Sequence, residues 1–524
     1  MKSDRALKTP YNCASRLWRR IPGYIRLTFA SAVALGLVTH LYMFTNKLTN
    51  HDDIGHLFIA DYGTASGRWL LPSILGLDGN FSMPWLIGLL SILCLAGVAC
   101  LTVSLLRIRH PIGCIVTAGI NVSFPTVTAT LTYMFTADGY FFGLLLAALS
   151  AYLSVRHGWW GSLLGAISLT LSMGIYQSYF PVAAVLMVGA LLFETLDGER
   201  SFKQLLLKGL RLVLTLAVAL AAYMIIVRIS TRNVALVDYM GISDMGKLSL
   251  AEIPSLISKG FDEYINFYMT DSVGCHFVFL KYAFAASALL GAVLLVLMLW
   301  KRKLGALRSI LAVVLAALYP FAGSLIYVMV PEAGVHTLML FGYAYILIAP
   351  VALVDYMELN FKQLPLRSFQ TVSAWIILLT IALTAYSYAV FANSVYLKID
   401  LSMRQCTAYS NRLLEKVESC DGYEQGMSLV LVGSQVRDDA LNATPQLDDV
   451  KLIGVYDMPG FRTTYTYGHF LRYYLGFPSE VYTGKTETAA ALAASETVQA
   501  MPVYPQSGSI QIIDNMVVVK LSND

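Results

Sequence analysis

The sequence predicts an all-α polytopic membrane bundle of about eleven transmembrane helices, followed by a small C-terminal extracytoplasmic α/β domain. Hydrophobic residues make up 57% of the 524 residues and charged residues only 13%, whereas soluble proteins carry roughly 25% charged residues. The mean hydropathy is +0.62. Long apolar runs recur as far as Phe391 and then stop. The last part of the chain therefore has the composition of a soluble domain.

The N-terminal segment, residues 1–26, is basic and precedes an apolar stretch from Leu27 to Phe44. Because no small-x-small cleavage site follows this stretch, we interpret it as an uncleaved first span. We therefore divide the chain into a cytoplasmic N-terminus (1–26), a transmembrane domain (27–393) and an extracytoplasmic domain (394–524).

Apolar stretches of spanning length recur along the transmembrane domain. We expect spans near residues 25–45, 84–106, 112–132, 139–155, 159–176, 179–196, 210–228, 277–299, 306–330, 336–355 and 370–392. Lys and Arg follow the second, fourth, sixth, eighth and tenth spans, and the intervening turns are charge-poor. The positive-inside rule then places the N-terminus in the cytoplasm and the C-terminus outside.

Two larger segments lie on the outer side in this topology. In the first, from about 230 to 275, apolar residues recur at helical spacing between Ile253 and Tyr268, which is equally typical of a helix in the membrane interface and of one packed on the bundle. In the tail we expect a helix over 401–419, strands over 427–432 and 451–456, and a helix over 486–500. A hairpin over 509–521 would turn at Asp514-Asn515.

The seven cysteines include no Cys-x-x-Cys pair, so we expect no thiolate metal site. Cys406 and Cys420 both fall in the tail, on the oxidising side. A disulfide between them and two free thiols are equally compatible with the sequence.

The loop from His51 to Trp69 contains more reactive side chains than a connection between two spans requires. Asp52 and Asp53 follow the first span directly, and a carboxylate there could take a proton from an attacking hydroxyl group. If the helix continues, the two side chains point about 100° apart. We favour Asp53 as the base, because it lies deeper in the loop that leads through Asp61 to Arg68. The alternative is a hydrated helix-end cap.

Arg68 is a candidate for binding a phosphate, because its guanidinium can form two parallel hydrogen bonds to one. Trp69 prefers the interfacial belt, so Arg68 would lie at head-group depth. Alternatively, Arg68 snorkels or pairs with Asp61. Further residues in outer turns could bind sugar hydroxyl groups. These are His51, Asp61, Trp69, Asp138, Tyr176, Gln177 and His336.

Three short motifs together resemble the GtrII-like membrane glucosyltransferases. They are Asp52-Asp53 after the first span, Ser66-Gly67-Arg68-Trp69 before the second, and Gly174-Ile175-Tyr176-Gln177-Ser178. The resemblance is best over about 25–200 and extends by topology to about 395.

The resemblance implies a GT-C type glycosyltransferase in the bacterial inner membrane. Such an enzyme takes a hexose, here most simply glucose, from a polyprenyl-phosphate carrier. It transfers the sugar to a surface polysaccharide such as the O-antigen of lipopolysaccharide. The acid of the first external loop maps onto Asp52 or Asp53. A prenyl-phosphate-sugar synthase and a flippase are the implied functional partners, and nucleic acid is not. We expect no cofactor, and the use of a divalent metal stays open.

A transporter or flippase for a lipid-linked sugar is the alternative. It would need the same cation and an apolar groove, but no base. The acids cluster at one face instead of forming a relay across the bilayer, and no two similar halves with interrupted helices occur. The sequence therefore favours the enzyme.

Overall fold

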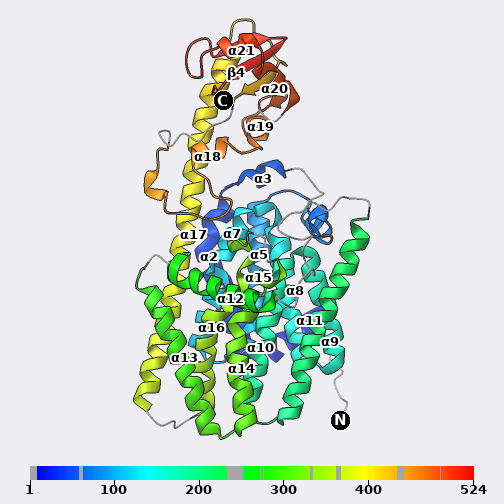
Figure 1. Cartoon of the computed structure of the whole chain (residues 1–524), viewed down its shortest axis with the longest axis vertical. Helices are drawn as coiled ribbons and strands as arrows, with labels where there is room; N and C mark the ends of the chain where they lie inside the picture. The colour runs from blue at the N-terminus through cyan, green and yellow to red at the C-terminus, as the bar shows by residue number, and fades with distance from the viewer. Residues whose placement is uncertain are drawn as a thin grey trace.

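The computed structural model shows a bundle of long, roughly parallel helices with a separate small domain above it (Figure 1). The first described residues lie towards the lower end of the bundle and the last described residues in the upper domain. The structure describes residues 9–57, 63–232, 252–271, 273–274, 277–330, 334–361, 367–433, 442–483 and 486–523.

The bundle consists of helices that are mostly 17 to 29 residues long, together with shorter helices at its ends. Its helices are α1 (Pro10–Arg20), α2 (Gly23–Thr45), α3 (His51–Gly55), α4 (Leu71–Leu75), α5 (Pro84–Leu105), α6 (Pro111–Ser123), α7 (Pro125–Thr132), α8 (Met134–Arg156), α9 (Gly158–Ile175), α10 (Phe180–Asp197), α11 (Phe202–Ser230), α12 (Ile253–Ile265), α13 (Leu280–Arg302), α14 (Ala306–Gly323), α15 (Ile326–Met329), α16 (Ala344–Asn360) and α17 (Arg367–Glu418).

Ten helical segments in the described part of the chain are long and apolar enough to cross a membrane. The one predicted span that is not among these ten, residues 159–176, corresponds to α9, an 18-residue helix that packs against α8 and α11. Large apolar side chains on α11, α13 and α14 are exposed, as expected for helices that face lipid. The predicted polytopic helical bundle with a small α/β domain is therefore confirmed, and the chain is a multi-pass membrane protein.

The third predicted span is interrupted. It consists of α6 and α7, which meet at Phe124 and Pro125. Proline has no N–H group and forces the preceding residue out of the helical conformation, and Phe124 accordingly has ψ 139°. The interruption lies inside the bundle, where both helices are almost wholly buried.

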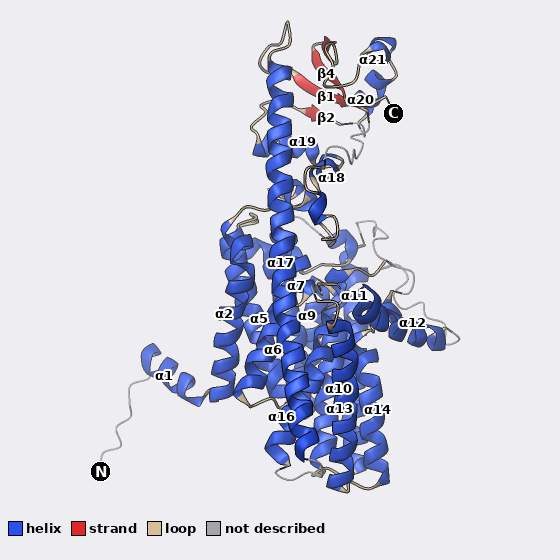
Figure 2. Cartoon of the chain, turned by 90° about the vertical axis from the view of Figure 1, so that its left-hand side faces the viewer, coloured by secondary structure: helices blue, strands red, loops and turns tan. Residues whose placement is uncertain are grey.

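The last predicted span and the first predicted helix of the tail form one helix, contrary to our expectation of two. Helix α17 runs without a break for 52 residues, from the lower end of the bundle into the upper domain (Figure 2). The segment contains neither Gly nor Pro, so nothing in it terminates a helix. The predicted boundary at 393/394 therefore falls inside a continuous element.

The tail contains a four-stranded sheet in the order β2-β1-β4-β3. Strand β1 (Ser428–Val432) is parallel to β2 (Val481–Tyr482) and to β4 (Met516–Lys520), and β4 is antiparallel to β3 (Ile510–Ile513). The short helices of the tail are α18 (Met458–Arg462), α19 (Tyr467–His469), α20 (Glu487–Ala493) and α21 (Glu496–Ala500).

Most of the predicted elements of the tail are present. The hairpin is confirmed, and Asp514 and Asn515 at its turn both have positive φ. The helix expected over 486–500 is divided into α20 and α21 by Ser495, whose side chain caps α21. The strand expected over 451–456 is wrong, because this segment forms turns. It lies against the bundle and has no neighbouring strand.

The disulfide between Cys406 and Cys420 is not formed, and both thiols are free. Cys406 is buried within α17, and Cys420 lies just beyond the end of this helix. The twelve residues of helix from Cys406 to Glu418 alone rise about 18 Å, far more than the roughly 7 Å that a disulfide can bridge.

The predicted basic segments meet at the end of the bundle that carries the N-terminus. Arg107 forms an ion pair with Asp197. The Lys208 ammonium contacts Glu194 at 2.5 Å and Arg308 donates to the Gly198 carbonyl. The loops between helices therefore separate into a basic end and an opposite end that includes α3, as the positive-inside rule predicts.

Helix α12 confirms the helix predicted near Ile253, and a π-helical turn, Asn266–Asp271, continues it. Helix α12 runs across the direction of the long helices in Figures 1 and 2. It contacts α14 and α15. Its place in the membrane interface stays a prediction.

Candidate active site

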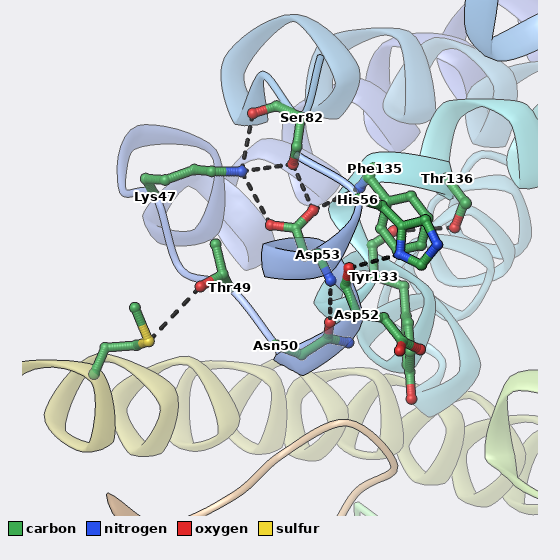
Figure 3. Close-up of polar contacts among 11 residues, drawn as sticks. Lys47, Thr49, Asn50, Asp52, Asp53, His56, Ser82, Tyr133, Phe135 and Thr136 are labelled. Atoms are coloured by element: carbon green, nitrogen blue, oxygen red, sulfur yellow. Dashed lines mark hydrogen bonds and ion pairs between the residues drawn. The ribbon is translucent and has the colours of Figure 1, made fainter. Parts of the chain in front are cut away.

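The first external loop begins with the five-residue helix α3. Asn50 is its N-cap, and the Asn50 side chain accepts the Asp53 N–H at 2.9 Å. Such a cap satisfies an amide that would otherwise have no partner at the start of the helix. It also fixes Asp52 and Asp53 in the first turn, as Figure 3 shows.

The Asp53 carboxylate is fully buried and engaged at both oxygens. The Lys47 ammonium lies 3.0 Å from Oδ2, and Oδ1 accepts the Ser82 hydroxyl at 2.5 Å and the Phe135 N–H at 3.0 Å (Figure 3). Lys47 also donates to the Ser82 carbonyl. Phe135 is the second residue of α8, so Asp53 lies at the positive end of a 23-residue helix dipole.

These contacts argue against our preference for Asp53 as the base. A base must reach the hydroxyl group from which it takes a proton, and Asp53 instead joins three segments of the bundle. Its contacts fix the loop in place.

The Asp52 side chain is 20% exposed and lies beneath the tail. It accepts a hydrogen bond from the Tyr465 hydroxyl, and His51 Nε2 lies 3.4 Å from its Oδ1. The His51 ring stands edge-on to Tyr133, Tyr456 and Tyr465, at centroid distances of 6.5, 5.2 and 5.7 Å. Burial lowers the pKa of His51, an effect that the nearby Asp52 charge opposes. The ring is therefore a neutral donor and acceptor at pH 7.

Arg68 lies on the inner side of the same loop region and is largely buried. Its Nη1 donates to the Tyr140 hydroxyl at 2.8 Å. The guanidinium also lies over the Tyr140 and Tyr176 rings, 5.7 and 5.1 Å from their centroids. These two rings stack on each other at 4.6 Å. A guanidinium that lies against aromatic rings keeps its charge and its orientation.

The second and third motifs pack directly on each other. The Leu70 N–H donates to the Gly174 carbonyl at 2.9 Å, and a side chain at Gly174 would meet the Trp69 indole at 2.5 Å. The Gln177 amide donates to the Ser66 carbonyl and to the Tyr223 hydroxyl, both at 2.8 Å. Gly174 therefore permits the contact that positions Arg68.

His336 joins the region around Arg68 from the turn before α16. Burial and the Arg68 charge lower the pKa of His336 to about 4. Its Nδ1 is buried and makes no hydrogen bond within the described part of the chain. The imidazole is therefore neutral at pH 7 and can donate to a ligand that Arg68 binds.

Helix α8 connects the two groups of residues. It presents the Phe135 N–H to Asp53 and the Tyr140 hydroxyl to Arg68. Five residues of helix correspond to a rise of about 7.5 Å. Asp53 and Arg68 therefore contact α8 at positions one to two turns apart. This brings the acidic pair and the guanidinium near each other, as a reaction between an acceptor and a phosphorylated donor requires.

Two predicted site residues remain. Asp138 is buried as the fifth residue of α8, where its carboxylate accepts the Gly139 N–H, and Asp61 lies outside the described residues. Among the described residues, no group of three or more His, Cys, Asp or Glu could hold a metal ion.

Sequence reasoning missed Lys47, Ser82, Tyr456 and Tyr465. Lys47 and Ser82 stand at the outer ends of the first two spans, and a cation near an acidic pair would have been the signal for Lys47. No signal links the two tyrosines to Asp52, because about 400 residues separate them in sequence.

Residues 41–348, more than half of the chain, match the model of a family described as glucosyl transferase GtrII. The match includes α3, Arg68 and Gln177 and ends within the first part of α16, before α17 and the tail. No curated protein and no solved structure gives a significant match.

Proposed function

The chain belongs to the glucosyl transferase GtrII family, and from this membership we propose that it transfers glucose from a polyprenyl-phosphate carrier to a surface polysaccharide. The proposed acceptor is a glycan such as the O-antigen of lipopolysaccharide. The reaction takes place on the outer face of the bacterial inner membrane. Neither composition nor fold suggests a role for nucleic acid.

One observation carries the proposal. The partly exposed Asp52 carboxylate and the buried Arg68 guanidinium lie at the same end of the bundle, where helix α8 contacts both Arg68 and Asp53, the neighbour of Asp52. A lipid-phosphate donor requires a cation near the membrane surface, and an acceptor hydroxyl requires a base above it. A transporter would need the cation but not the carboxylate.

In the proposed reaction, the Asp52 carboxylate accepts the proton of the acceptor hydroxyl as its oxygen attacks the anomeric carbon. The bond between that carbon and the phosphate oxygen breaks, and polyprenyl phosphate leaves. Arg68 and neutral His336 bind the phosphate and stabilise its additional negative charge. A single displacement inverts the anomeric configuration. Asp53 positions the loop through Lys47, Ser82 and Phe135.

The test is turnover by the purified full-length protein in lipid nanodiscs. Synthetic undecaprenyl-phosphate-glucose serves as donor, and polysaccharide extracted from the bacterium that encodes the chain serves as acceptor. We expect NMR of the product to show glucose on the polysaccharide with inverted anomeric configuration. Movement of the donor across the bilayer without any transfer would contradict the proposal and favour the transporter.

A further inference from the structure

The strongest unexplained feature of the molecule is a group of aromatic rings above α3. Tyr456 and Tyr465 come from the tail, at the two sides of α18, and Tyr133 comes from the end of α7. All three surround His51, next to Asp52. Tyr456 and Tyr465 lie outside residues 41–348, which match the family, so family membership does not account for them.

The tail is held firmly against the loop at this point. Gly454 lies so close that a side chain there would meet the Asn50 amide and the Tyr133 ring, each at 2.9 Å. The Lys398 ammonium on α17 donates to the carbonyls of Leu447 and Val450, both at 3.0 Å. The two tyrosines are therefore presented to α3 from a fixed support.

These rings are not buried as a purely structural contact would require. Tyr465 is 56% exposed and Tyr456 is 37% exposed. His51 Nδ1, by contrast, is buried and has no hydrogen-bond partner in the part of the chain that the structure describes. Such a polar atom normally finds a partner. Exposed aromatic faces around an unsatisfied imidazole and a carboxylate are typical of a ligand site.

A pyranose ring matches this arrangement. It presents an apolar C–H face, which packs on an aromatic ring, and a rim of hydroxyl groups, which bind carboxylate and imidazole. A ring on Tyr456 and Tyr465 would bring a hydroxyl group to Asp52. The donor phosphate belongs to the inner side, at Arg68. The tail faces away from the membrane, on the side from which a polysaccharide arrives.

We propose that Tyr456 and Tyr465 of the tail, together with His51, form the subsite that binds the acceptor sugar of the polysaccharide. This inference rests on the proposed function and extends it. The family-matched bundle would bind the donor, and the tail would select the acceptor. Tyr465 would have two roles, because its ring binds sugar and its hydroxyl group holds Asp52.

The test uses full-length protein in nanodiscs and measures KM for the polysaccharide and for undecaprenyl-phosphate-glucose separately. We expect Tyr456→Ala to raise KM for the polysaccharide by about tenfold or more, as loss of an aromatic anchor typically does, and KM for the donor by less than about twofold. Tyr456→Phe should restore the wild-type KM. Tyr456→Leu keeps an apolar side chain without an aromatic face and should behave like Tyr456→Ala.

Two variants of Tyr465 distinguish the contribution of its ring from that of its hydroxyl group. Tyr465→Phe should keep KM for the polysaccharide and reduce kcat, because only the hydrogen bond to Asp52 is lost. Tyr465→Ala should affect both. Tyr423→Ala is the matched control, because Tyr423 lies in the turn after α17 and far from α3. It should change neither KM.

Unchanged KM for the polysaccharide in both alanine variants would overturn the inference, as would an effect on the donor KM alone. The proposed function can fail independently, if wild-type protein transfers no glucose. In that case, equilibrium binding of the polysaccharide to wild-type and Tyr456→Ala protein decides the inference. Equal affinity would refute it, and an affinity lower by about tenfold in the variant would support the subsite.

Discussion

Asp52 and Asp53 are neighbours with different partners, so their loss should have different effects. Asp53→Asn would weaken the contact with Lys47 and the contacts with Ser82 and Phe135. We expect a loss of about 1–3 kcal/mol in the free energy of unfolding. Asp52→Asn should leave the stability close to wild type and reduce turnover by about 10²–10⁴.

The measurement is thermal unfolding and turnover of both variants at matched expression. Asp52→Asn serves as the control for the stability measurement, because it should unfold like the wild type. Asp53→Asn serves as the control for the turnover measurement, once its turnover is corrected for the fraction of folded protein. A fully active Asp52→Asn variant, together with an inactive but stable Asp53→Asn variant, would reverse the two roles.

Arg68 should not be replaceable by lysine even though the charge is kept. Lysine has a compact ammonium that neither packs as a plane against the Tyr140 and Tyr176 rings nor forms two parallel bonds to a phosphate. We expect Arg68→Lys to raise KM for the donor by about tenfold. Arg404→Lys is the matched control, because Arg404 is exposed and pairs with Asp400 on the same helix. Unchanged donor KM in Arg68→Lys would favour a snorkelling role.

His336 should make the protein sensitive to acid. Its pKa is lowered from 6.5 to about 4 by burial and by Arg68. The unfolded chain therefore takes up a proton between these values and the folded protein does not, so stability falls as the pH decreases from about 6.5 towards 4. We expect His336→Asn to lose less stability over this interval.

Thermal unfolding of both proteins between pH 7.5 and 4.5 provides the comparison. Other histidines are present in both, so the difference between the two curves isolates His336. Parallel curves would show that the His336 ring is solvated in the folded protein.

At the scale of elements, the contact between α3 and the tail depends on Gly454. Its φ is +79°, and a Cβ atom would displace the Asn50 side chain that caps α3. We expect Gly454→Ala to reduce turnover through movement of Asp52. Gly476→Ala is the matched control, because Gly476 has φ +76° with open space around it. Both variants carry the same backbone strain of about 1–2 kcal/mol. Equal turnover in the two would show that the Gly454 contact does not position α3.

Elements with a strong local signal could be predicted from the sequence, and elements defined by tertiary contacts could not. The apolar runs identify every span, and Asp514-Asn515 identifies the hairpin. The continuity of α17 was missed because hydropathy falls after Phe391, although no Gly or Pro interrupts the segment there. The segment 451–456 has the composition of a strand. It lies against Asn50 and Tyr133 instead, a contact that no local pattern contains.

The same limit applies to the site. The acids, Arg68, Trp69 and Gln177 are close in sequence to span ends, where polar groups are conspicuous. Their grouping depends on the packing of Trp69 on Gly174 and on the position of α8 beneath both groups. The burial of Asp53 argues against our preference for it, because order along a loop does not determine which side chain is buried.

At the scale of the whole molecule, the orientation in the membrane can be tested. The basic loops and the tail lie at opposite ends of the bundle, so the positive-inside rule predicts an extracytoplasmic C-terminus. We expect an alkaline phosphatase fused after Asp524 to be active in cells, and green fluorescent protein at the same position to be dark. A fusion after Lys303, in a basic loop, should give the reverse pattern. A fluorescent C-terminal fusion would contradict the topology and the location of the donor.

The unbroken course of α17 makes this helix a spacer of fixed length and fixed rotational phase. Fifty-two residues span about 78 Å, of which the bilayer core occupies about 30 Å. One residue inserted after Asn393 would turn everything above it by about 100° and carry Tyr456 and Tyr465 away from Asp52. Seven inserted residues would nearly restore the direction in which the tail faces, but they would raise the tail above α3 by about 10.5 Å. The helix thus fixes both the height and the rotation of the tail above α3.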